Sequence, residues 1–238
     1  MIDIHAHILP GLDDGPSDKA DALMIADMAA RDGIKIIIAT PHIHMDTKIT
    51  PSLVKTQVAA FNDLLYKEKI NISVLAGGEI AFSSSMNTPA GFCLHKGPYL
   101  LVEFPHTHLP DSAAEWLYQL QLQGFLPIIA HPERNPAVIR DPGLLIKLLV
   151  PGVFAQITAE SVTGGFGSQI QQCAHYLLRL GAAHFIATDT HSPDFRKPCL
   201  SKARKIAAKI IGKAAAEKLV SDHPAAVIQG ENLPDFGG

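Results

Sequence analysis

Short apolar runs alternate with longer amphipathic segments along most of the chain. Runs as apolar as these, separated by helical patterns, are typical of a parallel sheet covered on both faces by helices. The pattern predicts an α/β fold with seven strands, which lie in the segments IDIH (2–5), IKIIIATPH (34–42), INISVLAGGE (70–79), YLLVEF (99–104), FLPIIAHPE (125–133), GVFAQITAE (152–160) and HFIATDTH (184–191).

Several of the intervening segments carry signals for the start or the end of a helix. Thr50 precedes a proline, which suits an N-cap followed by the first helical residue. Ser112–Glu115 has the spacing of a capping box, and Gly124 is placed to end that helix. Apolar residues recur at helical spacing over 168–181 and stop at a glycine. The last residues, 232–238, are expected to form an unanchored tail.

The composition allows a large hydrophobic core. The chain has 238 residues, of which 47% are hydrophobic and 18% are charged, so it is neither disordered nor fibrous. No linker, low-complexity tract or repeat interrupts it. Because α/β barrels commonly reach this length as one unit, we expect a single domain over residues 1–238.

Charge, cysteine content and hydropathy narrow the classes of protein to consider. The formal net charge of -3 argues against a nucleic-acid binder, which usually carries an excess of basic residues. The 3 cysteines do not form a disulfide framework. The N-terminus lacks a secretory signal, and the apolar runs are much shorter than the roughly 20 residues of a membrane span. These features predict a cytoplasmic protein that does not insert into a membrane.

Side chains that commonly bind metals follow six of the seven predicted strands. In a (β/α) barrel the active site lies at the carboxyl ends of the strands. His5 and His7 are two residues apart, so a strand points both imidazoles to the same face. The sixth strand, ending near Thr158 and Glu160, offers no clear ligand. Imidazoles and carboxylates without thiolates suit manganese, iron or zinc, and the sequence predicts such a site from His5, His7, His42, Glu79, Glu103, His131, Asp189 and His191.

The motifs DIHAHILPGLDDG, ATPHIH, GGEI, VEF, AHPER and ATDTH resemble those of the PHP (polymerase and histidinol phosphatase) superfamily. Their order is most similar to that of the bacterial protein-tyrosine phosphatases found with capsule and exopolysaccharide genes. The resemblance covers residues 1 to about 196. It implies a distorted seven-stranded (β/α) barrel of the PHP type. It also implies up to three bound divalent metal ions, usually Mn²⁺, with iron or zinc as alternatives.

The resemblance also assigns ligands to each ion. For the first ion these are His5, His7, Glu79 and Asp189; for the second, Glu79 as a bridge with Glu103 and His131; for the third, Asp14, His42 and His191. Two positions leave alternatives open. Relatives commonly read TPHH where this chain places Ile43 after His42, which leaves the role of His44 open, and Asp13 is chemically equivalent to Asp14.

The chemistry implied by this resemblance is hydrolysis of a phosphomonoester. Metal ions about 3.5–4 Å apart can bind phosphate oxygens and lower the pKa of a water molecule toward ~7. Arg134 and Arg196 would hold phosphate oxygens bidentately. Either Asp14 or a metal-bound water could protonate the leaving tyrosyl oxygen. The implied activity is that of a protein-tyrosine phosphatase, and the implied substrate is a bacterial tyrosine kinase that controls polysaccharide export.

Other interpretations remain open. A phosphatase of the same superfamily that acts on a small molecule such as histidinol phosphate would carry similar motifs. Amidohydrolases also begin with HxH and end with an aspartate, although their barrels are usually longer and often contain a bridging lysine. A metal-stabilised binding or proofreading module without activity is a further possibility, but the chain retains the full set of ligands.

Two further motifs resemble functional patterns but are not assigned to the site. Residues 173–179 match the Cys-x5-Arg pattern of thiol-based tyrosine phosphatases, but they continue a helical repeat and contain no glycine. Amides inside a helix are already hydrogen bonded and cannot bind a phosphate, so we expect Cys173 to be a packing residue. His106 and His108 repeat the HxH spacing in a loop bounded by prolines, and their role is open.

Overall fold

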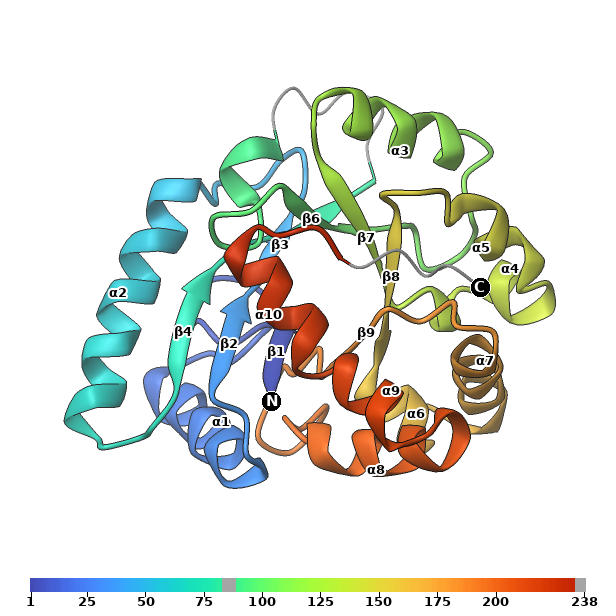
Figure 1. Cartoon of the computed structure of the whole chain (residues 1–238). Helices are drawn as coiled ribbons and strands as arrows, with labels where there is room; N and C mark the ends of the chain where they lie inside the picture. Colours follow the sequence, from blue (N-terminus) through green and yellow to red (C-terminus); the bar gives the residue numbers. More distant parts are fainter. Residues whose placement is uncertain (83–88, 234–238) are drawn as a thin grey trace.

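Nine parallel strands lie at the centre of this computed structural model, which describes residues 1–82 and 89–233 (Figure 1). One sheet has the order β1-β2-β4 and the other the order β3-β5-β6-β7-β8-β9. The strands are β1 (Ile2–Ala6), β2 (Ile36–Ala39), β3 (His42–Ile43), β4 (Ser73–Ala76), β5 (Glu79–Ala81), β6 (Tyr99–Glu103), β7 (Leu126–Ala130), β8 (Phe154–Thr158) and β9 (Phe185–Ala187).

All seven predicted strands are present, but the second and third are each divided in two. The second breaks after β2 at Thr40 and Pro41, where proline cannot donate to a ladder. The third breaks after β4 at Gly77, where a Cβ would lie 2.8 Å from the Ile38 side chain. The chain therefore crosses from the smaller sheet to the larger one twice.

The two sheets also meet between β9 and β1. Ala6 pairs with Thr190 in an isolated parallel bridge. The His7 amide donates to the Thr190 carbonyl at 2.9 Å, and the Asp189 amide donates to the His5 carbonyl at 2.8 Å. The closure lies at the carboxyl ends of these strands. The prediction of a distorted barrel is therefore confirmed.

Helices surround the strands (Figure 1). In the part of the chain that the structure describes, no helix is long and apolar enough to cross a membrane. The helices are α1 (Lys19–Asp32), α2 (Pro51–Lys67), α3 (Ala113–Leu122), α4 (Pro136–Arg140), α5 (Gly143–Leu148), α6 (Ala159–Thr163), α7 (Ser168–Arg179), α8 (Leu200–Ile211), α9 (Lys213–Lys218) and α10 (Asp222–Gln229), with 3₁₀ turns η1 (Pro89–Phe92) and η2 (Pro132–Arg134).

The predicted helix signals are confirmed with one exception. The Thr50 hydroxyl accepts from the Leu53 amide at 3.2 Å and caps α2. Gly124 follows α3 with φ +87, and Gly181 follows α7 with φ +67. Ser112 is the residue before α3, but its ψ of 9° is not the extended conformation of an N-cap and its side chain makes no cap hydrogen bond. The predicted capping box is therefore wrong.

A β-bulge in β1 determines which side chains reach the barrel interior. Asp3 pairs with Ile37 and Ala6 pairs with Ala39, so β1 uses three steps where β2 uses two. Ile4 packs in a cluster of mostly strand residues, whereas Ala6 packs in the larger cluster that includes the surrounding helices. A bulge interrupts the alternation of faces and redirects the following side chains. Within this irregular stretch, the His5 ring reaches Gln156 of β8, with 2.8 Å between Nδ1 and Oε1.

The chain remains anchored beyond α10. The Tyr99 hydroxyl donates to the Glu231 carbonyl at 2.7 Å and accepts from the Leu233 amide at 3.1 Å. Leu233 is buried. The expectation of an unanchored tail is wrong as far as Leu233, and residues 234–238 lie outside the described part of the chain.

Candidate metal centre

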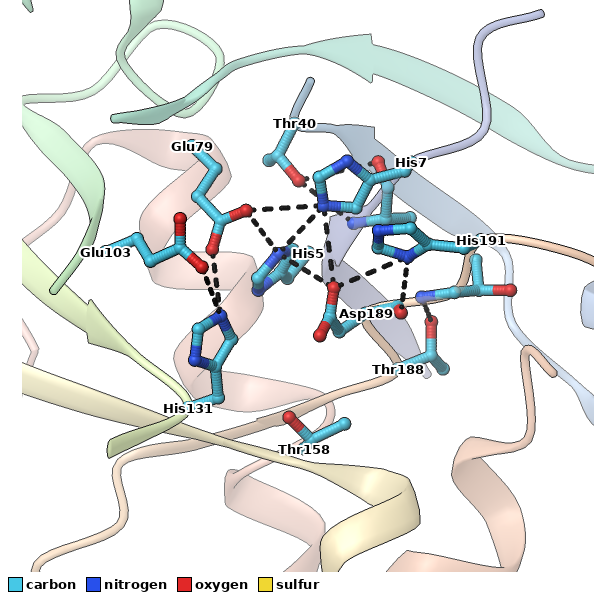
Figure 2. Close-up of polar contacts among 12 residues, drawn as sticks. His5, His7, Thr40, Glu79, Glu103, His131, Thr158, Thr188, Asp189 and His191 are labelled. Atoms are coloured by element: carbon cyan, nitrogen blue, oxygen red, sulfur yellow. Dashed lines mark hydrogen bonds and ion pairs between the residues drawn. The ribbon is translucent and has the colours of Figure 1, made fainter. Parts of the chain in front are cut away.

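His5, His7, Glu79 and Asp189 converge at the carboxyl end of β1 (Figure 2). The Nε2 atoms of the two histidines are 3.2 Å apart. Oε2 of Glu79 lies 3.3 Å from each Nε2. Oδ1 of Asp189 lies 3.2 Å from Nε2 of His5 and 3.5 Å from Nε2 of His7. The structure therefore brings together the four residues predicted for the first ion.

The residues predicted for the second ion lie on the other side of Glu79 (Figure 2). Nε2 of His131 is 3.1 Å from Oε1 of Glu79 and 3.4 Å from Oε1 of Glu103. Glu79 thus presents one oxygen to each group, as a bridging carboxylate would. His106, whose role the sequence leaves open, joins this group: its Nε2 is 3.2 Å from Oε1 of Glu103 and its ring stacks on His131.

The residues predicted for the third ion form a more exposed group. Oδ1 of Asp14 lies 3.5 Å from Nε2 of His42 and 3.3 Å from Nε2 of His191. The Asp14 side chain is 62% exposed, whereas that of His191 is 9% exposed. The His7 ring packs against the His191 ring with centroids 4.0 Å apart. His44 stacks on the outer side of this group, against His42.

Asp13 and Asp14 are adjacent but have different environments. Oδ2 of Asp13 lies 2.6 Å from Nδ1 of His7 and accepts from the His42 amide at 3.1 Å. Burial disfavours the charged carboxylate, but the hydrogen bond with His7 and the charge of that ring lower the pKa of Asp13 to about 2. This contact directs Nε2 of His7 toward the cluster. Gly15 allows the loop to approach so closely, since a Cβ there would lie 2.6 Å from the His7 carbonyl oxygen.

Two buried polar residues that the sequence analysis did not select support His5. Nδ1 of His5 lies 2.8 Å from Oε1 of Gln156 on β8, the strand for which no ligand is predicted. Asp3 accepts from the amide and the hydroxyl of Thr188, and burial raises its pKa to about 6. The sequence does carry a signal for both residues, because each is an amide or a carboxylate side chain within an otherwise apolar strand. Both residues are fully buried.

Both predicted phosphate-binding arginines contact Asp189. Nη1 of Arg134 donates to Oδ2 of Asp189 at 2.6 Å, and Nη2 of Arg196 donates to the same oxygen. Arg134 also lies over the Phe166 ring, 5.1 Å from its centroid. Burial disfavours the Asp189 carboxylate, but the surrounding charges, of which His5 contributes most, hold its pKa well below the usual range. Asp189 therefore faces the histidines with one oxygen and the arginines with the other.

Three residues of the site adopt left-handed backbone conformations. The φ angles are 34° at His131, 52° at Asp189 and 55° at Arg196. Such conformations cost about 1–3 kcal/mol each for residues other than glycine and are concentrated at functional sites. His131 and Asp189 follow the ends of β7 and β9, and Arg196 lies in the connection between β9 and α8.

The donor set of the cluster fits divalent metal ions. Five buried nitrogen or oxygen atoms of the predicted ligands make no hydrogen bond to any part of the chain that the structure describes: Nδ1 of His42, Oε2 of Glu79, Oε1 of Glu103, Oδ1 of Asp189 and Nε2 of His191. Buried polar atoms are normally paired. Groups of three or four of the ligand atoms lie within 4.8 Å of one another. Their number, chemistry and spacing suit coordination of cations.

The electrostatic balance of the cluster also favours cations. Burial favours neutral His131, but the adjacent carboxylates of Glu103 and Glu79 raise its pKa to about 9. The surrounding histidines, His5 above all, hold the pKa of Glu79 well below its usual value despite burial. The charged carboxylates thus favour the binding of positively charged groups or ions at the cluster. Protons and divalent cations compete for the same nitrogen atoms.

A cavity of about 590 Å³ opens beside the cluster. Asp14, His42 and Glu103 form part of its lining. Its volume is within the range of roughly 300–1,000 Å³ that is usual for small-molecule sites. A ligand in this cavity would reach the predicted metal ligands directly.

The Cys-x5-Arg segment lies inside α7, as predicted. Cys173 is buried, and burial raises the pKa of its thiol to about 12. Arg179 is the last residue of the same helix. A nucleophilic cysteine needs a lowered pKa and free amides around the phosphate. This segment has neither property.

The chain matches the model of a protein family described as "Capsular polysaccharide synthesis, CpsB/CapC" over residues 1–229. It is 41% identical to the tyrosine-protein phosphatase YwqE of Bacillus subtilis over 197 residues, which cover 81% of this chain and 78% of that protein. It is 26% identical to the tyrosine-protein phosphatase CpsB of Streptococcus pneumoniae, with 96% of this chain and 98% of that protein covered.

The chain is also similar to solved structures of tyrosine phosphatases. The chain superposes with a TM-score of 0.93 and 35% identity on a chain from the crystal structures of YwqE and CpsB, described as unique metal-dependent tyrosine phosphatases, covering 98% of this chain and 96% of that one. A lactonase from Listeria monocytogenes matches with a TM-score of 0.65 and 15% identity over 98% of this chain and 95% of that one. The lactonase shares the fold.

Proposed function

The chain belongs to the CpsB/CapC family of capsular polysaccharide synthesis proteins, and from this membership we propose how its site hydrolyses phosphotyrosine. The protein is a metal-dependent tyrosine-protein phosphatase of the CpsB/YwqE type. The observation that carries the proposal is the convergence, beside two arginines, of buried imidazole and carboxylate atoms that make no hydrogen bond within the described part of the chain.

We assign the binding of the ions to three groups of side chains. The ions are Mn²⁺ in this proposal, with iron or zinc as alternatives, because the ligands are imidazoles and carboxylates. When bound, such ions neutralise phosphoryl charge and supply a water nucleophile that ionises near neutral pH. The groups are His5, His7, Glu79 and Asp189; Glu79, Glu103 and His131; and Asp14, His42 and His191.

Arg134 and Arg196 hold the phosphate in this proposal. Each guanidinium donates to a single oxygen of Asp189, which leaves other N–H groups for a phosphate. Nε of Arg196 is buried and has no hydrogen-bond partner among the described residues. Asp189 orients both guanidinium groups beside the cluster, so a bound phosphate contacts the arginines and the metal site together.

Asp14 is the group that we assign to proton transfer toward the leaving oxygen. Its carboxylate is the most exposed of the predicted ligands and lines the cavity. A tyrosyl oxygen has a pKa near 10, so it leaves more readily than an alkyl alcohol. The natural substrate that we propose is a phosphotyrosine in a bacterial tyrosine kinase that controls polysaccharide export, consistent with the description of the family. We place the protein in the cytoplasm, consistent with its three free cysteines.

A substrate panel tests this function. The purified, Mn²⁺-loaded protein is assayed for phosphate release from a phosphotyrosine peptide and from histidinol phosphate, and for hydrolysis of a set of amides and lactones. We expect the phosphotyrosine peptide to give the highest kcat/KM. Preferred hydrolysis of histidinol phosphate, or of an amide or lactone, would show that the site serves a different reaction.

Changing Arg134 to alanine is expected to lower kcat on a phosphotyrosine peptide by roughly 10²-fold, the order seen when one preorganised donor is lost. The metal content should stay at the wild-type level, because Arg134 donates to the oxygen of Asp189 that faces away from His5 and His7. Arg134→Lys should recover little activity, since lysine lacks the planar fork. Elemental analysis and steady-state kinetics measure the two effects.

Arg140→Ala is the matched control for this substitution, because Arg140 is an exposed arginine at the end of α4. It should retain wild-type kinetics. If Arg134→Ala protein loses its metal or fails to fold, then Arg134 has a structural role and the assignment to phosphate binding is wrong.

Changing Cys173 to serine is expected to leave kcat/KM within about twofold of the wild-type value, since a buried thiol with a pKa of about 12 is not a nucleophile. Thiol alkylation should inhibit far less than chelation does. The measurement is phosphate release by folded Cys173→Ser protein with its metal content determined. Loss of activity in such a sample would point to a cysteine nucleophile.

A further inference from the structure

Three aromatic side chains, Phe82, Phe104 and Trp116, form a wall beside the predicted metal cluster. Phe82 follows β5, the strand that carries Glu79, and Phe104 follows Glu103 at the end of β6. The Phe82 amide donates to the Glu103 carbonyl at 2.7 Å. The two strands that supply carboxylates to the cluster therefore also supply two rings directly next to it.

The rings of this aromatic wall hold one another in place. The centroids of Phe82 and Phe104 are 5.8 Å apart. Both rings meet Trp116 of α3 in T-shaped contacts, with centroid distances of 5.1 Å and 5.9 Å. Edge-to-face contacts in this distance range are favourable for aromatic pairs. The wall is thus ordered before any ligand binds, which reduces the entropic cost of binding.

The wall and the cluster face the same cavity. Phe82 and Phe104 line the cavity of about 590 Å³ that is also lined by Asp14, His42 and Glu103. Leu12 and Ile49 add aliphatic groups to the lining. The lining therefore combines imidazole and carboxylate groups with an apolar surface.

We propose that Phe82 and Phe104 bind the aromatic ring of the phosphotyrosine substrate and so select aryl phosphates over alkyl phosphates. This inference rests on the proposed function, because the phosphate must lie at the cluster. The ring is joined to the phosphate through one oxygen atom, so a phosphate at the cluster carries the ring into the adjoining cavity. There the ring meets apolar aromatic surface, with which it forms favourable contacts.

An alkyl phosphate does not make these contacts. In a seryl phosphate the ester oxygen is joined directly to the β-methylene group with no ring between them, so this ester leaves the surface of the aromatic wall exposed to water. The lost burial lowers its affinity in proportion to the apolar area. Selection for tyrosine thus comes from the ring, while the arginines and the cluster recognise the phosphate that both esters share.

Binding of two phosphonates to the Mn²⁺-loaded protein isolates the contribution of the ring. Phenylphosphonate and methylphosphonate present similar anionic groups, and calorimetry gives Kd for each. In Phe82→Ala protein we expect Kd for phenylphosphonate to rise roughly 10-fold while Kd for methylphosphonate stays near the wild-type value. KM for a phosphotyrosine peptide should rise in parallel, with kcat little changed.

Two further variants test whether the effect comes from the ring itself and not from a loss of structure. Phe104 is more buried than Phe82, so Phe104→Leu is used because it removes the ring and keeps most of the apolar volume. It should weaken binding of phenylphosphonate in the same direction. Phe125→Ala is the matched control, since Phe125 is also half-buried but precedes β7, at the opposite end of that strand from His131. In Phe125→Ala protein, Kd for phenylphosphonate and Kd for methylphosphonate should both equal the wild-type values.

The failure of this inference and the failure of the proposed function have different signatures. If wild-type protein releases no phosphate from a phosphotyrosine peptide, the proposed function is wrong. If the wild type is active but Phe82→Ala and Phe104→Leu bind phenylphosphonate as tightly as it does, only the role of the wall is wrong. An equal loss of affinity for both phosphonates would likewise overturn the selection of aryl phosphates by these rings.

Discussion

Changing Glu79 to alanine is expected to lower kcat on a phosphotyrosine peptide by roughly 10³-fold or more, the upper end of the effect of removing one electrostatic group. Glu79 is fully buried and presents one oxygen to His5 and His7 and the other to His131. In our assignment it bridges two ions. Its loss removes a negative charge shared by both, so the affinity for metal should fall as well.

Two further variants separate this effect from a general loss of structure. Glu79→Gln keeps the size of the side chain but not its charge, and it should also lose most of the activity and part of the metal. Glu115→Ala removes an exposed carboxylate from α3 and should behave like the wild type. Circular dichroism checks the fold, and elemental analysis gives the metal content. Wild-type activity in Glu79→Ala protein would exclude a bridging role.

The general position of the site could be predicted because of one property of parallel sheets. The carboxyl ends of the strands gather at one end of a barrel, so residues as distant in sequence as His5 and Asp189 were expected to meet. They lie 3.2 Å apart between Nε2 and Oδ1. The same reasoning places Glu103 and His131 together, although β6 and β7 are separated by α3.

Other features depend on tertiary structure and could not be predicted. The bulge in β1 shifts the register by one residue, and no local pattern marks it. Asp13 and Asp14 are chemically identical, and only the path of the loop decides which one faces Nδ1 of His7. Gln156 lies on a strand without an obvious ligand, where it contacts His5 across the barrel.

Local sequence signals predicted some helix ends and backbone conformations correctly and others not. The threonine before Pro51 caps α2 because the proline fixes the first helical residue, whereas Ser112 fails to cap α3 because its backbone is not extended. The left-handed conformations of His131 and Asp189 have no signal in the sequence, since neither residue is glycine. These conformations result from packing around the site.

Removal of the metal is expected to abolish phosphatase activity completely. The described part of the chain offers no cysteine nucleophile at the site: the pKa of the buried Cys173 on α7 is raised to about 12, and no cysteine belongs to the groups of possible metal ligands. In our proposal the arginines bind phosphate, and a guanidinium group does not supply an attacking group. Activity should therefore depend on the ions that we assign to the nine predicted ligands.

The experiment compares one preparation as purified, after removal of the metal, and after Mn²⁺ is added back. The protein is treated with a chelator, dialysed until elemental analysis finds no transition metal, and then titrated with Mn²⁺. Circular dichroism before and after stripping establishes that the fold persists, so that a loss of activity is not a loss of structure. A parallel titration with Mg²⁺ tests whether a hard cation that prefers oxygen ligands can replace Mn²⁺ at a site rich in imidazole.

Phosphate release from a phosphotyrosine peptide by the stripped protein, as Mn²⁺ is added back, is the most direct measurement of the central claim. We predict no release above background without metal, and recovery to the initial rate as the binding groups fill. Undiminished release from protein shown to be free of metal would contradict the claim that ions held by this cluster carry out the reaction.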